Sequence, residues 1–313
     1  MKIKIRLIYA VLSGLLITMP SMTFAGGAQN GKGASFEFVD CPGYGGEGVN
    51  EGLNCYSVQG TSQGNHELDC TIIVPDGVSN RKKAPMIAWA NGWEQGNVLG
   101  QCTTNGYLRG LKEWARSGYL VAAANQWSVQ ESDVLACARW VADNSAGKNA
   151  LVPFDGKNIG IVGHSQGGGA VIKAGNGSQG VKVTAVMAMN PYGPAWVNSA
   201  DQDGQVLIVG GRLDTTTPPD SYQAAWDAIS AQGDPGGINA VLKQGTHNSD
   251  AWNGDGTSGT ASCLDASTTN FGAYQDVGMI WWDIQLKGKK YSRILKGMLS
   301  DDDVWETPRY SNF

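Results

Sequence analysis

Hydrophobic positions along the chain form short apolar runs that alternate with stretches of helical periodicity. The apolar runs are closed by turn-forming residues and predict β-strands at 71–74, 85–90, 119–124, 159–163, 183–189, 206–209 and 240–242. Apolar residues spaced three or four apart predict helices at 107–116, at 133–143, from 166 onward, at 222–229 and at 274–286. Strands that alternate with helices predict an α/β fold, with a mostly parallel central sheet and helices on both faces.

The first 25 residues have the layout of a secretory signal peptide. Three basic residues precede an apolar run at 7–19, and the small-residue cleavage signal Thr23-Phe24-Ala25 follows. The apolar run of about 13 residues is shorter than the roughly 20 that span a bilayer as a helix. We therefore expect cleavage after Ala25, with a retained anchor as the alternative, and a protein exported to the extracellular space or the periplasm.

We expect the rest of the chain, residues 26–313, to form a single domain. That length suffices for one α/β domain with a deep core, and neither an internal repeat nor a linker divides it. Residues 26–65 are rich in glycine and weakly patterned, so we interpret them as an irregular N-terminal arm.

Charge and composition narrow the range of partners. Three of the 23 basic residues and none of the 28 acidic ones lie in the signal peptide, so the mature chain has 20 basic and 28 acidic residues, a net charge of −8. Nucleic acids and anionic membrane surfaces require clustered positive charge, which is missing here. We also expect no cofactor and no metal: no C-x-x-C pair occurs, the three histidines are scattered, and the calcium-like turn at 253–256 has Ala251 where an acid is needed.

The segment Gly163-His164-Ser165-Gln166-Gly167 matches the pattern G-x-S-x-G. It follows an apolar strand and precedes a predicted helix, which is the setting of a nucleophile elbow. The sharp turn strains the serine backbone, and the two glycines allow strand and helix to approach closely. A surface serine in a glycine-rich turn is the alternative, but the setting favours Ser165 as a nucleophile.

A serine hydroxyl needs a base to take its proton. Of the three histidines, His66 precedes the predicted sheet and His164 lies beside the serine, so the candidate base is His247, after the strand at 240–242. A solvated loop histidine is the alternative interpretation of His247.

The candidate acid is Asp214, which follows the strand at 206–209. The resulting chain order of serine, acid and histidine is the order in α/β hydrolases. Asp220 is the competing acid, and we interpret it as an N-terminal residue of the following helix. Asp214 would hold the histidine in the right tautomer and stabilise its protonated form.

A tetrahedral intermediate needs two hydrogen-bond donors. We assign one to the backbone N–H of Gln166, directly after the nucleophile. We assign the other to the backbone N–H of Trp93, in the loop after the strand at 85–90. An ordinary turn followed by a core tryptophan is the alternative interpretation of Trp93.

With these residues in view, the chain from about 84 to 287 resembles the bacterial polyesterase–lipase–cutinase family of α/β hydrolases, which includes cutinase-like and PET-hydrolysing enzymes. The matching positions are Val162-Gly163-His164-Ser165-Gln166-Gly167-Gly168-Gly169, Asp214, Gly245-Thr246-His247 and the segment from Trp281 to Gly288. The resemblance implies an α/β-hydrolase fold and ester hydrolysis. The chain departs from the family at Gln166, where methionine is frequent, and at Tyr192, where tryptophan is usual, which bears on polyester cleavage rather than on ester hydrolysis.

The spacing between nucleophile and acid predicts an uncapped site. Ser165 and Asp214 are 49 positions apart, and the elbow helix and two strands leave a loop at about 190–205 that is too short for a helical cap. We expect an open groove whose walls, also explicable as core packing, are the aromatic residues Trp93, Tyr192, Trp196 and Trp252.

The sequence therefore predicts a secreted, monomeric serine carboxylic-ester hydrolase that acts on small esters or polyester chains through an acyl-enzyme. A peptidase or amidase on the same fold is one alternative. A non-catalytic binding module is another, although such proteins usually lose a triad residue.

Six cysteines in an exported chain predict disulfides, with 15 connectivities possible. We predict a Cys102–Cys137 bond, because both residues are expected near the catalytic edge of the sheet.

Overall fold

The protein is represented by a computed structural model, which describes residues 34–39, 52–61, 67–92, 104–126, 128–146, 150–177, 180–193, 202–232, 235–247 and 268–313. Several sequence predictions lie outside the described residues: the signal peptide, Trp93, Trp196, Trp252, the turn at 253–256, and Cys102.

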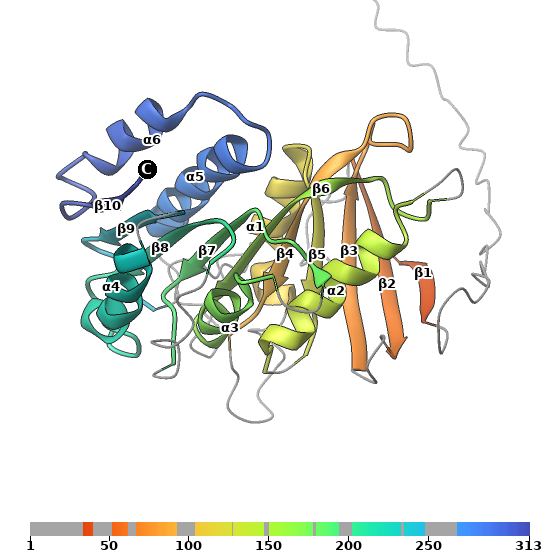
Figure 1. Cartoon of the computed structure of the whole chain (residues 1–313), viewed down its shortest axis with the longest axis horizontal. Coiled ribbons are helices and arrows are strands. Elements are labelled where there is room, and N and C mark those ends of the chain that lie inside the picture. The colour runs from red at the N-terminus through yellow and green to blue at the C-terminus, as the bar shows by residue number, and fades with distance from the viewer. Residues whose placement is uncertain are drawn as a thin grey trace, which may run out of the picture.

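Ten strands in the described residues form one mixed sheet (Figure 1). They are β1 (Ser35–Val39), β2 (Leu53–Thr61), β3 (Glu67–Pro75), β4 (Ala84–Ala90), β5 (Leu120–Ala124), β6 (Phe154–His164), β7 (Ala185–Met189), β8 (Gln205–Gly211), β9 (Gly237–Leu242) and β10 (Arg309–Ser311). Their order across the sheet is β1-β2-β3-β5-β4-β6-β7-β8-β9-β10. The strands from β5 to β9 in this order are parallel, while β1, β2 and β3 at one side and β10 at the other pair antiparallel. The parallel strands therefore all end at the same edge.

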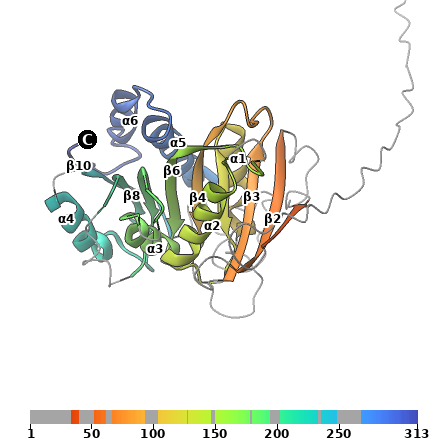
Figure 2. The same cartoon turned by 45° about the vertical axis from the view of Figure 1, so that its right-hand side comes forward.

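Helices cover both faces of the sheet (Figures 1 and 2). They are α1 (Thr104–Arg116), α2 (Glu131–Asp143), α3 (Gln166–Ala174), α4 (Gln223–Gln232), α5 (Thr268–Gln285) and α6 (Ser292–Leu299). Helices α2, α3 and α4 contribute to the core on one face, and α1, α5 and α6 to the core on the other. Among the described helices, none is long and apolar enough to cross a membrane.

Strand β4 shows why the sequences of the parallel strands are continuous apolar runs. Met86 and Ala88 are buried in one core, and Ile87 and Trp89 are buried in the other. Because side chains of a strand alternate between the two faces, a strand covered on both faces needs apolar residues at every position. The predicted α/β architecture with a mostly parallel sheet is therefore present, with an antiparallel addition at each side.

The interpretation of 26–65 as an irregular arm is wrong for the part that the structure describes. This part contains β1 and β2, and β2 pairs along its whole length with β3. Cys55 and Val58 of β2 are fully buried, on opposite faces of the sheet. The partly exposed residues Asn54, Tyr56 and Ser57 lie between the buried ones, so the strand shows neither a continuous apolar run nor a regular alternation, which is why hydrophobic patterning did not predict it.

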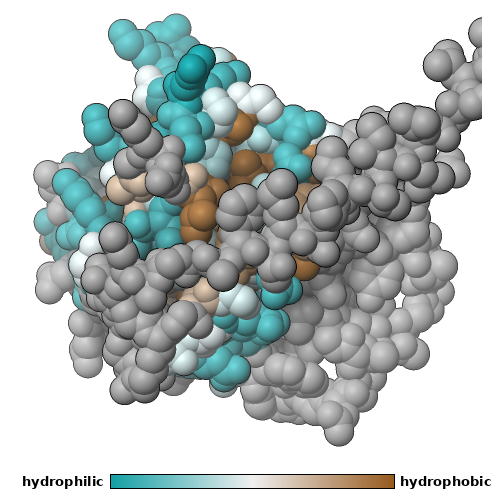
Figure 3. Space-filling view, turned by 90° about the vertical axis from the view of Figure 1, so that its right-hand side faces the viewer, coloured by the Kyte–Doolittle hydropathy of each residue, from teal (hydrophilic) through white to brown (hydrophobic). Residues whose placement is uncertain are grey.

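Some described hydrophobic side chains at the β1 side of the sheet are exposed. Figure 3 views the molecule from this side and shows hydrophobic residues exposed among hydrophilic ones. Phe36 of β1 stacks on Tyr56 of β2, with 4.6 Å between ring centroids, whereas Phe38 is 65% exposed. Because they are two positions apart, Phe36 and Phe38 lie on the same face of β1, and Phe38 also contacts Tyr56 edge-on, with 5.7 Å between ring centroids. This aromatic cluster is therefore partly buried at Phe36 and exposed at Phe38.

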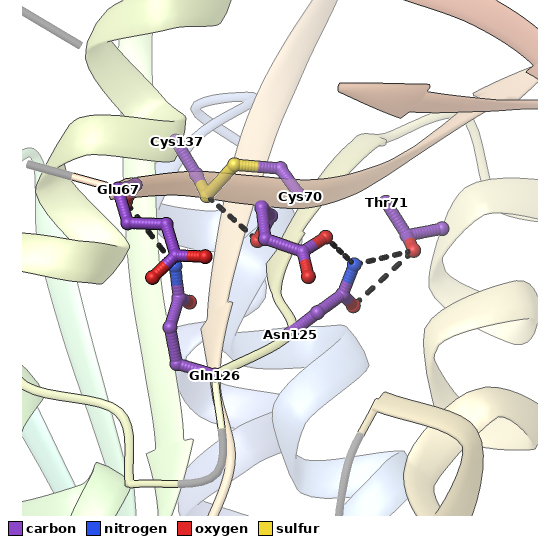
Figure 4. Close-up of a disulfide and its surroundings, with 7 residues drawn as sticks. Glu67, Cys70, Thr71, Asn125, Gln126 and Cys137 are labelled. Atoms are coloured by element: carbon purple, nitrogen blue, oxygen red, sulfur yellow. Dashed lines mark hydrogen bonds between the residues drawn. A yellow bond between two sulfur atoms is a disulfide. The ribbon is translucent and has the colours of Figure 1, made fainter. Parts of the chain in front are cut away.

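The predicted Cys102–Cys137 disulfide is wrong, because Cys137 is bonded to Cys70 (Figure 4). Cys137 lies on the buried face of α2, and that face packs across the sheet onto β3, which carries Cys70. The two Cα atoms are 6.0 Å apart, within the usual range for a disulfide. Cys55 is also disulfide-bonded, and no described cysteine is a free thiol.

Candidate active site

Ser165 forms the tight turn between the end of β6 and the start of α3. Its φ of 54° and ψ of −119° are strained for a residue with a side chain. Glycines make the turn possible: a Cβ on Gly163 would lie 2.4 Å from the Gly167 carbonyl oxygen, and one on Gly167 would lie 2.2 Å from that of Ala90. Ser165 therefore has the strained strand–turn–helix setting that the sequence predicted.

Three parallel strands of the sheet bring three polar side chains to one edge. Ser165 directly follows β6, Asp214 follows β8 and His247 follows β9. Oγ of Ser165 lies 2.9 Å from Nε2 of His247, and Nδ1 of His247 lies 2.8 Å from Oδ2 of Asp214. The structure thus brings the three predicted triad residues into one hydrogen-bonded chain.

The Asp214 carboxylate is buried and held by the turn that follows it. Oδ1 accepts hydrogen bonds from the backbone N–H groups of Thr216 and Thr217, at 2.8 and 2.7 Å, and Oδ2 accepts one from the Thr217 hydroxyl at 2.6 Å. Burial raises the pKa of the Asp214 carboxyl, but the hydrogen bonds and charge interaction with His247 and the bonds from Thr217 lower it below its ordinary value. Because the ionised Asp214 carboxylate faces Nδ1 of His247, a neutral His247 imidazole carries its proton on Nδ1. Nε2 is then free of a proton and can accept the one from the serine hydroxyl.

Asp220, the competing acid, lies elsewhere. It is exposed in the first turn of a short 3-10 helix, Pro219–Tyr222, as expected for an acidic residue at a helix N-terminus.

Gln166, one of the two predicted oxyanion donors, directly follows the serine. Gln166 is the first residue of α3, so its backbone N–H has no acceptor within the helix. The Gln166 side chain donates to the Ser128 hydroxyl at 2.7 Å and is thereby directed toward the loop before α2. The second predicted donor, Trp93, lies outside the described residues, but the preceding Gly92 lies against the serine, because a Cβ there would be 3.2 Å from Cβ of Ser165.

Tyr192 is the one predicted groove residue that the structure describes. Its side chain is 53% exposed, and its backbone N–H donates to the Ser165 carbonyl oxygen at 2.7 Å. Tyr192 is therefore on the surface next to the nucleophile rather than in the core. Whether it forms a groove with Trp93, Trp196 and Trp252 stays a prediction.

Sequence reasoning did not predict the residues that support the triad. Thr217 is fully buried and contacts the acid, and its hydroxyl also lies 3.0 Å from Nδ1 of His247. Asn190, directly after β7, is fully buried and donates to the His247 carbonyl oxygen. A weak signal existed for Asn190, because asparagine after a strand is a residue type that tolerates positive φ, and its φ is 41°.

The site residues offer a nucleophile, a base and an acid that orients the base.

Among the described residues, no group of three or more histidine, cysteine, aspartate or glutamate side chains is placed to hold a metal ion. In comparisons with known proteins, no protein-family model matches the chain, and the search of curated proteins finds no match.

Proposed function

We propose that the protein is a secreted serine carboxylic-ester hydrolase with the α/β-hydrolase fold. The observation that carries the proposal is the chain of hydrogen bonds from Ser165 through His247 to Asp214, at 2.9 and 2.8 Å, with the serine in a strained elbow. The same constellation of nucleophile, base and orienting acid performs acyl transfer on several unrelated folds. Its chain order, serine then acid then histidine, is the order of α/β hydrolases.

In the proposed reaction, Oγ of Ser165 attacks the ester carbonyl carbon while Nε2 of His247 takes the hydroxyl proton. The carbonyl π electrons move onto the oxygen, and the tetrahedral intermediate carries a negative charge. When the intermediate collapses, the alkoxy group leaves and takes the proton from His247, so that an alcohol departs and an acyl-serine is left. A water molecule then attacks the acyl-serine by the same steps, releases the acid and restores the serine hydroxyl.

The backbone N–H of Gln166 is proposed to bind the negatively charged oxygen. It lies at the N-terminus of α3, where the positive end of the helix dipole also favours an anion. The Trp93 N–H is proposed as the second donor. Ionised Asp214 favours the protonated form of His247 that exists during the reaction.

The proposed substrates are esters that reach an uncapped site. The connection from β7 to β8 spans residues 190–204, which is short for a helical cap. Exposed Tyr192 beside the nucleophile would contact an acyl or alcohol group. Small soluble esters, and polyester chains that extend past both ends of the site, fit this arrangement.

Export is proposed from the N-terminal sequence. The Cys70–Cys137 disulfide supports it, because such bonds persist mainly in oxidising compartments. Determination of the N-terminal sequence of the protein recovered from culture medium or periplasm tests this proposal, and a mature chain that still begins at Met1 would contradict it.

The activity is tested with purified protein on p-nitrophenyl acetate, butyrate and palmitate beside a p-nitroanilide. We expect hydrolysis of the two short esters, weak hydrolysis of palmitate and none of the anilide. Ser165→Ala and His247→Ala should each lower kcat by about 10³ to 10⁶, and a fluorophosphonate should label Ser165.

The matched control is Ser300→Ala, which changes an exposed serine at the end of α6 and should retain full activity. Cleavage of the anilide at a comparable rate would favour the amidase alternative. Absence of both ester hydrolysis and labelling would leave a binding module as the better interpretation.

A further inference from the structure

The backbone carbonyl oxygen of His247 accepts two side-chain hydrogen bonds. Nε2 of His164 lies 2.6 Å from it, and Nδ2 of Asn190 lies 3.0 Å from it. His164 ends β6 and Asn190 follows β7, so the two donors come from neighbouring parallel strands. The backbone of His247 is thereby tied to the part of the sheet that carries the nucleophile.

The protonation state of His164 follows from a hydrogen-bond partner at each of its two ring nitrogens. Because a carbonyl oxygen only accepts, the bond to His247 requires a proton on Nε2 of His164. A neutral imidazole then has a bare Nδ1, and this atom accepts from the Tyr107 hydroxyl at 2.6 Å. Burial and the charge of nearby His247 lower the pKa of His164 to about 3. The hydrogen bond to the His247 carbonyl and the charge of Asp214 raise this pKa, but by less. The ring is therefore neutral and held in one tautomer.

Asn190 connects the two segments that carry Asp214 and His247. Its side-chain oxygen accepts from the Gly211 N–H at 2.9 Å, at the end of the strand before Asp214, and from the Tyr274 hydroxyl at 3.4 Å. Its backbone oxygen lies 3.0 Å from the Thr217 hydroxyl oxygen, which donates its proton to Asp214. Its side-chain nitrogen donates to the His247 carbonyl. A buried residue at a φ of 41° keeps this strained conformation only where the surroundings determine it, and such residues concentrate at functional sites.

We propose that His164 and Asn190 are positioning residues that fix the orientation of the His247 imidazole by binding its backbone carbonyl oxygen. The inference rests on the proposed function, and it assigns that site two residues that touch neither substrate nor reacting atoms. When the His247 carbonyl is held in place, the orientation of the backbone from which the His247 side chain projects is held too. The direction from Nε2 of His247 to Oγ of Ser165 is then fixed as well. A displacement of about 1 Å in a reacting group lowers a rate by about a hundredfold.

The test for Asn190 is the Asn190→Asp variant. Aspartate keeps an oxygen for the Gly211 N–H and tolerates positive φ, but it has no N–H to donate to His247. We expect kcat for p-nitrophenyl butyrate to fall by about 10- to 100-fold with KM changed less than about threefold. The matched control is Asn312→Asp, the same change at the other described asparagine with positive φ, which lies near the C-terminus and should keep wild-type kcat.

The test for His164 is a comparison of two variants. Glutamine reaches about as far as the Nε2 of histidine and retains an N–H donor, whereas leucine fills similar space without one. We expect His164→Gln to retain at least tenfold more kcat than His164→Leu. A purely structural role would lower the melting temperature in both variants without this difference in kcat.

A spectroscopic measurement separates this proposal from the proposed function. The downfield proton of His247 Nδ1–H, which faces Asp214, should be a sharp NMR signal in the wild type and should broaden or shift in Asn190→Asp and His164→Leu. This signal is observed whether or not the protein hydrolyses esters, so an inactive wild type would overturn only the proposed function. Either of two results would overturn the positioning role. One is a folded Asn190→Asp variant that keeps wild-type kcat and an unchanged signal. The other is an equal kcat in His164→Gln and His164→Leu.

Discussion

Acidification from pH 7 to pH 5 should destabilise the folded protein by about 2 kcal/mol through His164 alone. In the unfolded chain this histidine takes up a proton near its ordinary pKa of 6.5, whereas in the fold its pKa is lowered to about 3 by burial and by nearby His247. Between these two values the unfolded state binds one more proton than the folded state, so stability falls as the pH falls. The slope approaches about 1.4 kcal/mol per pH unit in the middle of this window.

The stabilising contribution is fully present above pH 6.5 and is lost progressively as the pH falls toward about 3. Asp214 acts in the same direction but at lower pH, because its carboxyl pKa is lowered from an ordinary value of 3.8. The interval from pH 7 to pH 5 therefore lies above the range in which Asp214 titrates.

The assay is urea unfolding at pH 7, 6 and 5, with the disulfides intact and the unfolding followed by tryptophan fluorescence. His164→Gln is the comparison, because it keeps a donor at this position and removes the titrating group. The free energy of unfolding of the wild type should fall by about 2 kcal/mol more than that of the variant between pH 7 and pH 5. In the folded wild type, the His164 ring resonances should not titrate between pH 8 and pH 4.

Two results would refute this reasoning. One is a His164 ring that titrates near pH 6.5 in the folded protein, which would mean that the ring is accessible to protons. The other is an equal loss of stability in wild type and His164→Gln, which would place the pH dependence on other groups.

Three further predictions concern the disulfide, the turn at the nucleophile and the kinetics of the proposed site. Replacing both Cys70 and Cys137 by alanine should lower the free energy of unfolding by about 4 kcal/mol, from the loop entropy of a separation of 67 residues, and an unchanged urea midpoint would contradict this. Gly167→Ala should abolish ester hydrolysis and lower the melting temperature, because its Cβ would lie 2.2 Å from the Ala90 carbonyl oxygen; Gly297→Ala, with no atom within 4 Å, is the control and should be neutral or stabilising by up to about 1 kcal/mol. Because the proposed uncapped site would have no lid to open, the rate on butyrate esters should show no jump above the solubility limit, and a sharp jump would indicate that loops close over the site.

The sequence by itself determined most elements of the central sheet and the positions of the three residues of the proposed triad. Strands covered on both faces need apolar residues throughout, so β4, β6 and β8 are visible as apolar runs. An elbow needs glycines where backbones meet, so Gly163 and Gly167 identify Ser165. Parallel strands end at one edge, and for this reason Asp214 and His247 could be assigned from their places after strands. Each of these signals is local, within a few residues of the feature it predicts.

The tertiary structure alone decided which residues meet across long sequence separations. Strand β2 is held by its pairing with β3 rather than by its own pattern, and Cys137 meets Cys70 because α2 crosses the sheet over β3. The bonds from His164 and Asn190 to His247 join segments 83 and 57 residues apart. Such contacts depend on strand register and helix packing, which arise from the whole sheet and leave no periodic signal in the residues that make them.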